Sequence, residues 1–246
     1  MNGIRCGNEM DPFLCPMEAT TLKEKLNADE RAFRHIIAAI VSHKVRPGDR
    51  IYEPSLSQEL GLSRTPIRHA ISRCLSEGLL EKNRGQKGYA VPILTPEDME
   101  QVFQAREAIE GQTASLAALS AEPDEIAELR RLNRLERETF ESATRDEYAE
   151  LNREFHFLVA DMSRNVYLKR YVTQVYWRSQ LYTFYLGWFY SLGTEGTQRS
   201  KHHVSHIEHA EIIDALERKD SDGARDRIVR HIRATYHVRF LPGSER

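Results

Sequence analysis

The feature that most constrains the fold is a break at Gly61 between two segments of helical periodicity. Ser55–Leu60 predicts a short helix, and glycine at the next position is typical of a helix end. A second helix is predicted to open at Ser63, whose side chain can cap the first turn. Pro66 follows within that turn, where a missing amide hydrogen costs little. The sequence therefore predicts two short helices joined by a tight turn.

The flanking segments extend this pair into a larger unit. Another helical pattern begins at Asp29 and stops at Pro47-Gly48, which is a turn signal. After the second helix, two short extended pieces are predicted at 81–84 and 88–92, joined by a glycine-containing turn. Three helices followed by a β-hairpin are typical of a winged helix-turn-helix.

Helical periodicity dominates the chain beyond residue 94, where alternating β-branched runs are absent. Thr95 with Asp98 three residues later predicts a capped helix start. The expected fold is mainly α, with an N-terminal winged helix-turn-helix and a C-terminal all-α helical bundle. The expected helices after the linker are 96–120, 123–142, 146–163, 165–191, 202–218 and 221–237. The expected divisions are a flexible tail (1–21), a winged-helix domain (22–92), a linker (93–95) and a helical domain (96–246).

Charge is distributed unevenly between these parts. Residues 22–92 hold thirteen Lys and Arg against eight Asp and Glu, a net charge of +5, whereas residues 93–246 carry −5. This asymmetry favours a polyanion as partner of the first module only, although a bias of this size is also common without function.

Composition excludes several other classes. The most apolar stretch, Tyr171–Tyr190, is interrupted by polar and charged residues, so no membrane span is predicted. The N-terminus lacks a basic region followed by an apolar run, which argues against a secretory signal. Three scattered cysteines are too few for a disulfide framework. We therefore expect a cytoplasmic protein.

Arg64 and Arg68 lie four residues apart and project from one face at the start of the predicted second helix. Free amide hydrogens at that end suit phosphate oxygens, and Thr65 adds a hydroxyl donor. Arginine can also read guanine in the major groove. A merely solvated charged face is the alternative. The predicted DNA contacts, with the hairpin tip included, are Ser63, Arg64, Thr65, Arg68, Arg84, Gly85 and Lys87.

The stretch from Phe33 to Val91 resembles the winged-helix domain of the GntR family of bacterial regulators. The matching motifs are Pro47–Ile51, Leu56–Arg68 and Glu77–Leu80, followed by the glycine-containing wing. The resemblance implies that Arg64, Thr65 and Arg68 contact DNA from the recognition helix, and that Arg84 and Gly85 lie at the wing tip. Pro54 stands where many relatives carry a basic residue, which puts one phosphate contact in doubt.

Residues 98–237 resemble the helical ligand-binding (FCD) domain of the FadR-type branch of this family. The resemblance implies a homodimer, a metal site and an effector cavity beside it. It rests on shorter motifs, which are Arg106 with Glu110, Asn152–His156, Glu208-His209 with Ile212–Ala215, and His231.

The spacing of the histidines supports a metal site independently. Asn152 and His156 share a helix face, while His209 and His231 lie on two other predicted helices. Three imidazoles that converge can bind Zn²⁺ or Ni²⁺. Asn152 replaces the aspartate of many relatives, so its carbonyl would ligate without a charge and the site would favour an anionic ligand. Core or surface histidines are the alternative.

Arg106 falls where the family places an arginine that lines the effector cavity, and it could hold a carboxylate in a bidentate manner. A purely structural Arg106–Glu110 pair is an equal alternative. The aromatic-rich segment 171–190 is expected to form core or dimer interface, with a few residues walling the pocket.

The leading hypothesis is a homodimeric transcriptional regulator, typically a repressor, that binds operator DNA and responds to a small organic acid. A metal-responsive regulator is the alternative, in which the ion itself is the signal. A metal-dependent hydrolase is a remote third hypothesis, because no HExxH or other catalytic set is present. We expect no catalytic residues.

Overall fold

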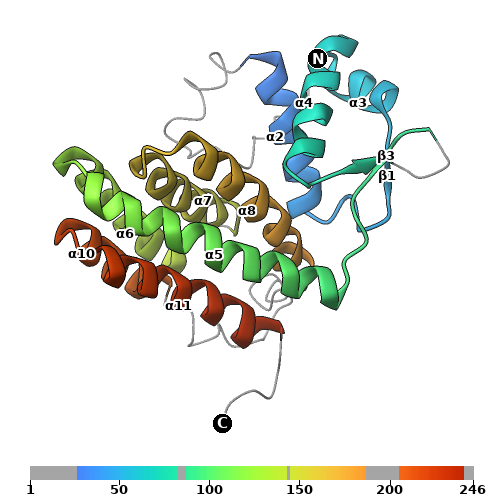
Figure 1. Cartoon of the computed structure of the whole chain (residues 1–246). Coiled ribbons are helices and arrows are strands. Elements are labelled where there is room, and N and C mark those ends of the chain that lie inside the picture. The colour runs from blue at the N-terminus through green and yellow to red at the C-terminus, as the bar shows by residue number, and fades with distance from the viewer. Residues whose placement is uncertain (1–26, 83–86, 143–144, 187–204, 241–246) are drawn as a thin grey trace.

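A computed structural model describes residues 27–82, 87–142, 145–186 and 205–240. The N-terminal part contains α2 (Ala28–Val41), β1 (Arg50–Ile51), α3 (Glu53–Leu60), α4 (Arg64–Ser76), β2 (Glu81–Lys82) and β3 (Tyr89–Ala90). These elements form a small helical unit with a short sheet at one edge (Figure 1). The predicted tail, residues 1–21, lies outside the described residues.

Helix α2 packs against α4 in this unit. Asn27 caps it by accepting a hydrogen bond from the amide of Glu30, and the buried residues recur at helical spacing. Phe33, Ile36 and Ile40 all lie on this stripe and are buried against α4. The helix exists because this apolar stripe has a matching face to pack on.

The turn between α3 and α4 depends on Gly61, whose φ of 63° is left-handed and closes the end of α3. Helix α4 begins at Arg64, and Ser63 is its N-cap residue in an extended conformation. The expectation that the Ser63 side chain caps the helix is wrong, since it makes no capping hydrogen bond. Pro66 and Ile67 face the core and anchor the start of the helix.

The hairpin is part of a three-stranded antiparallel sheet of order β1-β3-β2. Its register pairs Arg50 with Ala90 and Lys82 with Tyr89. Strand β1 was not expected from the sequence, because two residues carry no periodicity and become a strand only by pairing with β3.

The C-terminal part is entirely helical within the described residues, and the expected fold class is confirmed. Helix α5 runs through the bundle and packs against α11, α8 and α7, while α6 packs on α7 and α10. Thr95 caps α5 by accepting from the amide of Asp98, as the sequence predicted. The helices are α5 (Pro96–Ser120), α6 (Pro123–Ser142), α7 (Arg145–Met162), α8 (Val166–Leu186), α10 (Ser205–Glu217) and α11 (Ser221–Phe240).

Helix α8 joins the two parts, since it contacts α2 as well as α5 and α7 (Figure 1). Tyr176, Trp177 and Phe184 on α8 belong to the same apolar cluster as the core of the winged helix. The described part of the aromatic-rich segment is therefore largely core, and residues 187–190 lie outside the described range.

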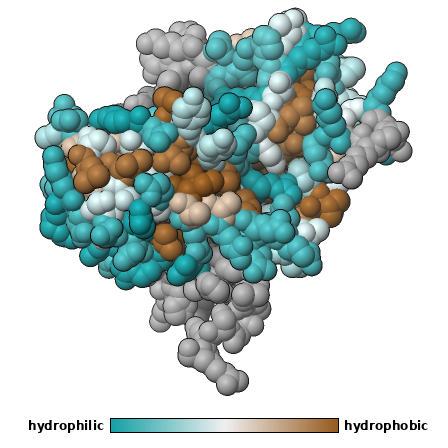
Figure 2. All heavy atoms as spheres, viewed as in Figure 1, coloured by the Kyte–Doolittle hydropathy of each residue, from teal (hydrophilic) through white to brown (hydrophobic). Residues whose placement is uncertain are grey.

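The surface is predominantly hydrophilic in the view of Figure 2, with apolar side chains gathered in a band across the helical bundle. None of the described helices is both long enough and apolar enough to cross a membrane.

Candidate DNA-binding face and histidine site

The N-terminal end of α4 presents polar side chains on its outer face. Arg64 and Thr65 are exposed, while Ile67 and Ala70 on the opposite face are buried. The first amides of α4 have no partner within the helix, so cationic side chains and free donors lie together. This arrangement suits the phosphates of a duplex.

Arg68 is exposed as predicted, but its guanidinium is engaged. Its Nε donates to Oε2 of Glu53 on α3 at 2.9 Å, and the hydroxyl of Tyr89 on β3 donates to Oε1 of the same carboxylate. The hydrogen bond from Arg68 holds the pKa of the Glu53 carboxyl below its ordinary value. Contact between Arg68 and DNA would thus compete with an internal partner that the sequence did not indicate.

The wing is described only at its base. Lys87 is exposed two residues before β3, and Gly88 has a φ of 108° where a β-carbon would meet Tyr52. The predicted contacts Arg84 and Gly85 lie outside the described residues.

The three predicted histidines converge inside the helical bundle. His156 comes from α7, His209 from α10 and His231 from α11, and all three are buried. One ligand nitrogen from each ring lies within 4.8 Å of the others.

Each histidine has its own carboxylate partner at Nδ1. Glu110 accepts from His156 at 2.6 Å, Glu136 from His209 at 2.6 Å, and Glu208 from His231 at 2.7 Å. The acceptor at Nδ1 fixes the ring tautomer and orientation, so the other nitrogen, Nε2, keeps a free lone pair that a metal ion could use. This pairing is typical of metal-ligating histidines.

The remaining nitrogens support the same interpretation. Nε2 of His156 and Nε2 of His209 are buried and have no hydrogen-bond partner. Unpaired buried polar atoms are costly, and a metal ion would satisfy both. The residues present therefore fit a divalent ion such as Zn²⁺ or Ni²⁺, for which an open coordination position would remain.

The pKa values of the buried groups favour binding of a cation at this site. Burial raises the pKa of Glu110, but the Arg106 guanidinium and the His156 ring outweigh it and bring the pKa to about 2. Burial lowers the pKa of His156 to about 4, although Glu110 partly opposes this. At neutral pH the carboxylate is therefore charged and the imidazole neutral, which is the protonation state that a metal requires.

Asn152 lies one turn before His156 on α7 and lines the same cavity. Its Nδ2 donates to the hydroxyl of Tyr176 at 3.0 Å, so the amide nitrogen already has a partner. The carbonyl oxygen is the atom available for a metal, and the assignment of Asn152 as a ligand stays a prediction.

Arg106 forms the structural pair with Glu110 and also lies beside the cavity, while its contact with an effector stays a prediction. Its Nε donates to Oε1 of Glu110 at 2.5 Å, and its Nη1 donates to the hydroxyl of Ser179 on α8 at 3.1 Å. It is 3% exposed and also lines the cavity beside His156 and His231. The structural pair and the cavity position are therefore compatible.

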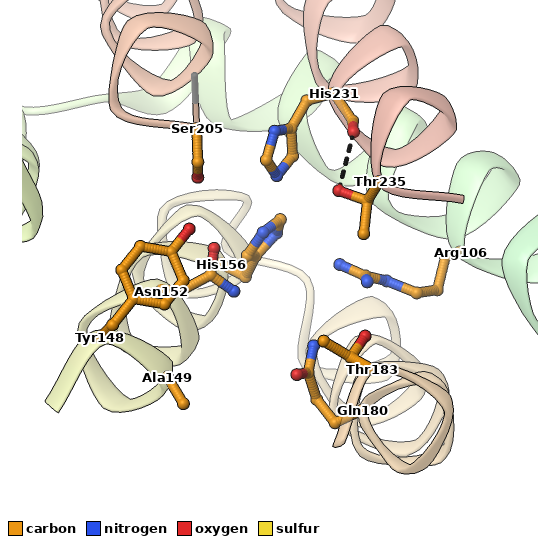
Figure 3. Close-up of a pocket in the computed structure, with 10 residues that line it drawn as sticks. All are labelled: Arg106, Tyr148, Ala149, Asn152, His156, Gln180, Thr183, Ser205, His231 and Thr235. Carbon is orange, nitrogen blue, oxygen red and sulfur yellow. Dashed lines mark hydrogen bonds between the residues drawn. The ribbon is translucent and has the colours of Figure 1, made fainter. Parts of the chain in front are cut away.

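The cavity is a small space that is partly open to solvent. Figure 3 shows Asn152, His156 and His231 directed into it from α7 and α11, with Arg106 reaching it from α5. Gln180 and Thr183 border it from α8. Most of these groups are hydrogen-bond donors or cations, which suits an anionic ligand of small size.

The residue that sequence reasoning missed is Glu136. It is 2% exposed and accepts from Ser205 as well as from His209. Its only sequence signal is its place on the apolar stripe of α6, four residues after the buried Leu132. A glutamate on a buried stripe requires a partner, and here that partner is His209.

A winged helix-turn-helix followed by a helical bundle is the architecture of a class of DNA-binding transcriptional regulators. Two family models agree. The model described as "Bacterial regulatory proteins, gntR family" matches residues 28–91, and "FCD domain" matches residues 101–234, more than half of the chain. The chain belongs to the GntR family of transcriptional regulators and carries an FCD domain. These are regulators and not enzymes, which excludes the hydrolase alternative.

Regulators from other bacteria are similar in sequence to this protein over most of its chain. One is the "Uncharacterized HTH-type transcriptional regulator YdhC" of Bacillus subtilis, 27% identical over 76% of this chain and 79% of the relative. Another is the "Nta operon transcriptional regulator" of Aminobacter aminovorans, 28% identical over 78% and 85%. Among solved structures, E. coli McbR/YncC superposes with a TM-score of 0.72 at 19% identity, covering 87% of this chain and 97% of that one. That structural likeness shows the fold.

Proposed function

We propose that this protein is a homodimeric repressor of metabolic genes that binds a pseudo-palindromic operator. Its affinity for the operator changes when a small carboxylate binds at a metal in the helical domain. The observation that carries the proposal is the set of three buried histidines, each oriented by a carboxylate, beside Arg106.

The DNA contacts proposed are the predicted ones, with Arg64 and Thr65 foremost because both are exposed and neither is in an ion pair among the described residues. A monomer offers one recognition helix, and two copies related by a two-fold axis would match two half-sites about 34–36 Å apart. Relatives named as regulators of the Nta and Uxu operons support a role in controlling an operon.

The effector proposed is a small organic acid. When bound, the metal supplies a Lewis-acidic centre with open positions for carboxylate oxygens. Arg106 adds a guanidinium that can form a second, charge-assisted contact. Asn152 contributes no negative charge, so the cavity repels an anion less than one with aspartate at this position would.

The test combines DNA retention with ligand titration. Fragments upstream of the protein's own gene and its neighbours are footprinted with the wild type and with an Arg64→Ala/Arg68→Ala variant. The proposal expects protection that the double variant loses, and operator affinity that changes with carboxylates only in Zn²⁺- or Ni²⁺-loaded protein. Retention of DNA by the double variant, or indifference to every carboxylate, would contradict it.

A metal-responsive regulator is the second candidate, favoured by the unpartnered Nε2 atoms of His156 and His209. In that case the ion alone would change operator affinity, and an Arg106→Gln variant would respond like the wild type. In the first case the ion alone would have little effect, and Arg106→Gln would lose the response to carboxylates.

A further inference from the structure

Helix α8 contacts the histidine cavity along one of its faces. The Tyr176 ring lies 5.1 Å from the Arg106 guanidinium carbon and 5.4 Å from the His156 ring. One turn on, Ser179 accepts the hydrogen bond from Arg106. Any change in the position of Arg106 or His156 on ligand binding therefore reaches α8 directly.

The other face of α8 supports the end of the recognition helix. Nε2 of Gln174 donates to the carbonyl oxygen of Ser76, the last residue of α4, at 3.0 Å. Arg178 packs over Gly78, just beyond that helix end, where a β-carbon would stand 3.5 Å from the arginine side chain. The C-terminal end of α4 is therefore held by α8.

A third contact passes through α2. Trp177 meets Phe33 edge to face, with the ring centroids 6.1 Å apart and the planes at 84°. The guanidinium of Arg73, on α4, lies 3.5 Å from the centroid of the same Phe33 ring and also pairs with Glu30 and Glu77. Trp177 is thus the chain neighbour of Tyr176, which contacts Arg106 and His156, and it reaches the recognition helix through the single ring of Phe33.

We propose that Gln174 and Trp177 are positioning residues that transmit the state of the histidine cavity to the recognition helix. Tyr176 and Trp177 are neighbours on a rigid helix, so a rotation of α8 that follows Arg106 or His156 also moves Trp177 and Gln174. Packed cores change between discrete arrangements and do not deform continuously, so a small shift would reorient α4 as a unit. The proposal rests on regulation of DNA binding through the cavity, as proposed above.

The test measures coupling and not binding alone. Operator affinity is determined with and without Zn²⁺, and with Zn²⁺ plus a carboxylate that alters wild-type binding, using fluorescence anisotropy. The variants are Gln174→Ala and Trp177→Phe, singly and together. Thr173→Ala is the matched control, because the Thr173 hydroxyl donates only to the Lys169 carbonyl in its own helix among the described contacts.

Allosteric coupling typically changes affinity by about 5- to 150-fold. The ratio of operator affinities with and without Zn²⁺ plus carboxylate should be the same in Thr173→Ala as in the wild type. In the double variant this ratio should lie within about twofold of one. Zn²⁺ affinity by calorimetry should change by less than about threefold, which separates lost transmission from a lost site. A double variant that binds Zn²⁺ and operator and keeps the wild-type factor would overturn the inference while leaving the regulated function standing. A wild type without any response would overturn both.

A spectroscopic measurement provides a second, independent readout. The chain has two tryptophans, so a Trp188→Phe variant leaves Trp177 as the sole emitter. Its emission should shift both when Zn²⁺ and carboxylate bind and when operator binds, because the environment at Phe33 changes. Emission that is unaffected by the ligands in a variant that still responds in DNA binding would contradict the proposed path.

Discussion

The Nδ1 atom of His156 and the Oε2 atom of Glu110 lie 2.6 Å apart in the buried interior of the bundle. Glu110 also holds Arg106 through its other oxygen, so one carboxylate orients both the His156 ring and the cavity-lining guanidinium. The helix spacing allows this because Arg106 and Glu110 lie one turn apart on α5.

Glu110→Gln should therefore weaken metal binding without removing a ligand. The amide is uncharged and holds the His156 ring less firmly, and loss of such a partner typically costs 10- to 100-fold in affinity. Calorimetry with Zn²⁺ measures it. Glu107→Gln is the matched control, since Glu107 lies on the same helix but pairs with Arg233 on α11. Equal affinities in the two variants would show that the Glu110 carboxylate does not orient a ligand.

The metal-free protein should lose stability as the pH falls from 6.5 toward 4. The pKa of His156 is lowered by burial to about 4 in the folded state, whereas an unfolded chain protonates it near 6.5. The unfolded state then binds the extra proton in this window, so the stabilisation is complete above pH 6.5 and declines below it. The loss from this residue amounts to roughly 3 kcal/mol.

Urea unfolding at pH 7.5, 6.5, 5.5 and 4.5 in the presence of a chelator measures this dependence. His156→Gln should reduce the slope in this window, because its titration is removed while that of His231, whose pKa burial also lowers, remains. Thr173→Ala, which removes no titratable group, should leave the slope as in the wild type. If His156→Gln retained the full slope, burial of its neutral ring would not be the cause.

Gly61→Ala should cost about 1 kcal/mol of stability through backbone strain alone. The φ of 63° is unfavourable for alanine, and no atom lies within 4 Å of where its β-carbon would stand. Asn, which tolerates this conformation better, should cost less. Thermal unfolding would show a midpoint lower by roughly 2–4 °C for alanine. An unchanged midpoint would mean that the turn adopts another conformation.

The sequence was sufficient to predict the helices and the helix-turn-helix, because Gly61, Pro66 and the apolar stripes are local signals. It was also sufficient to predict that His156 lies near two distant histidines, through the family resemblance together with the place of each histidine on a separate helix. Contacts between elements carry no local signal. Arg68 pairs with Glu53 only because α3 packs on α4, and His209 pairs with Glu136 only because α6 packs on α10. The packing of α8 against the winged helix is likewise a contact between distant elements.

The pair between Arg68 and Glu53 leads to a prediction about DNA affinity. Glu53 is the acidic partner of Arg68 near the start of the recognition helix, and its carboxylate both occupies Arg68 and would repel phosphate. Glu53→Gln should therefore raise affinity for duplex DNA by a few fold at low salt, and steepen the dependence on salt concentration by up to about one counterion.

Glu59→Gln, on the same helix but paired with His35 away from Arg68, is the control. Fluorescence anisotropy with a labelled duplex between 50 and 200 mM salt distinguishes them, because Arg68 freed to contact a phosphate changes the slope, whereas the loss of one distant charge changes it little. If Glu53→Gln bound more weakly than the control, the carboxylate would be acting to orient Arg68 for the groove and not to restrain it.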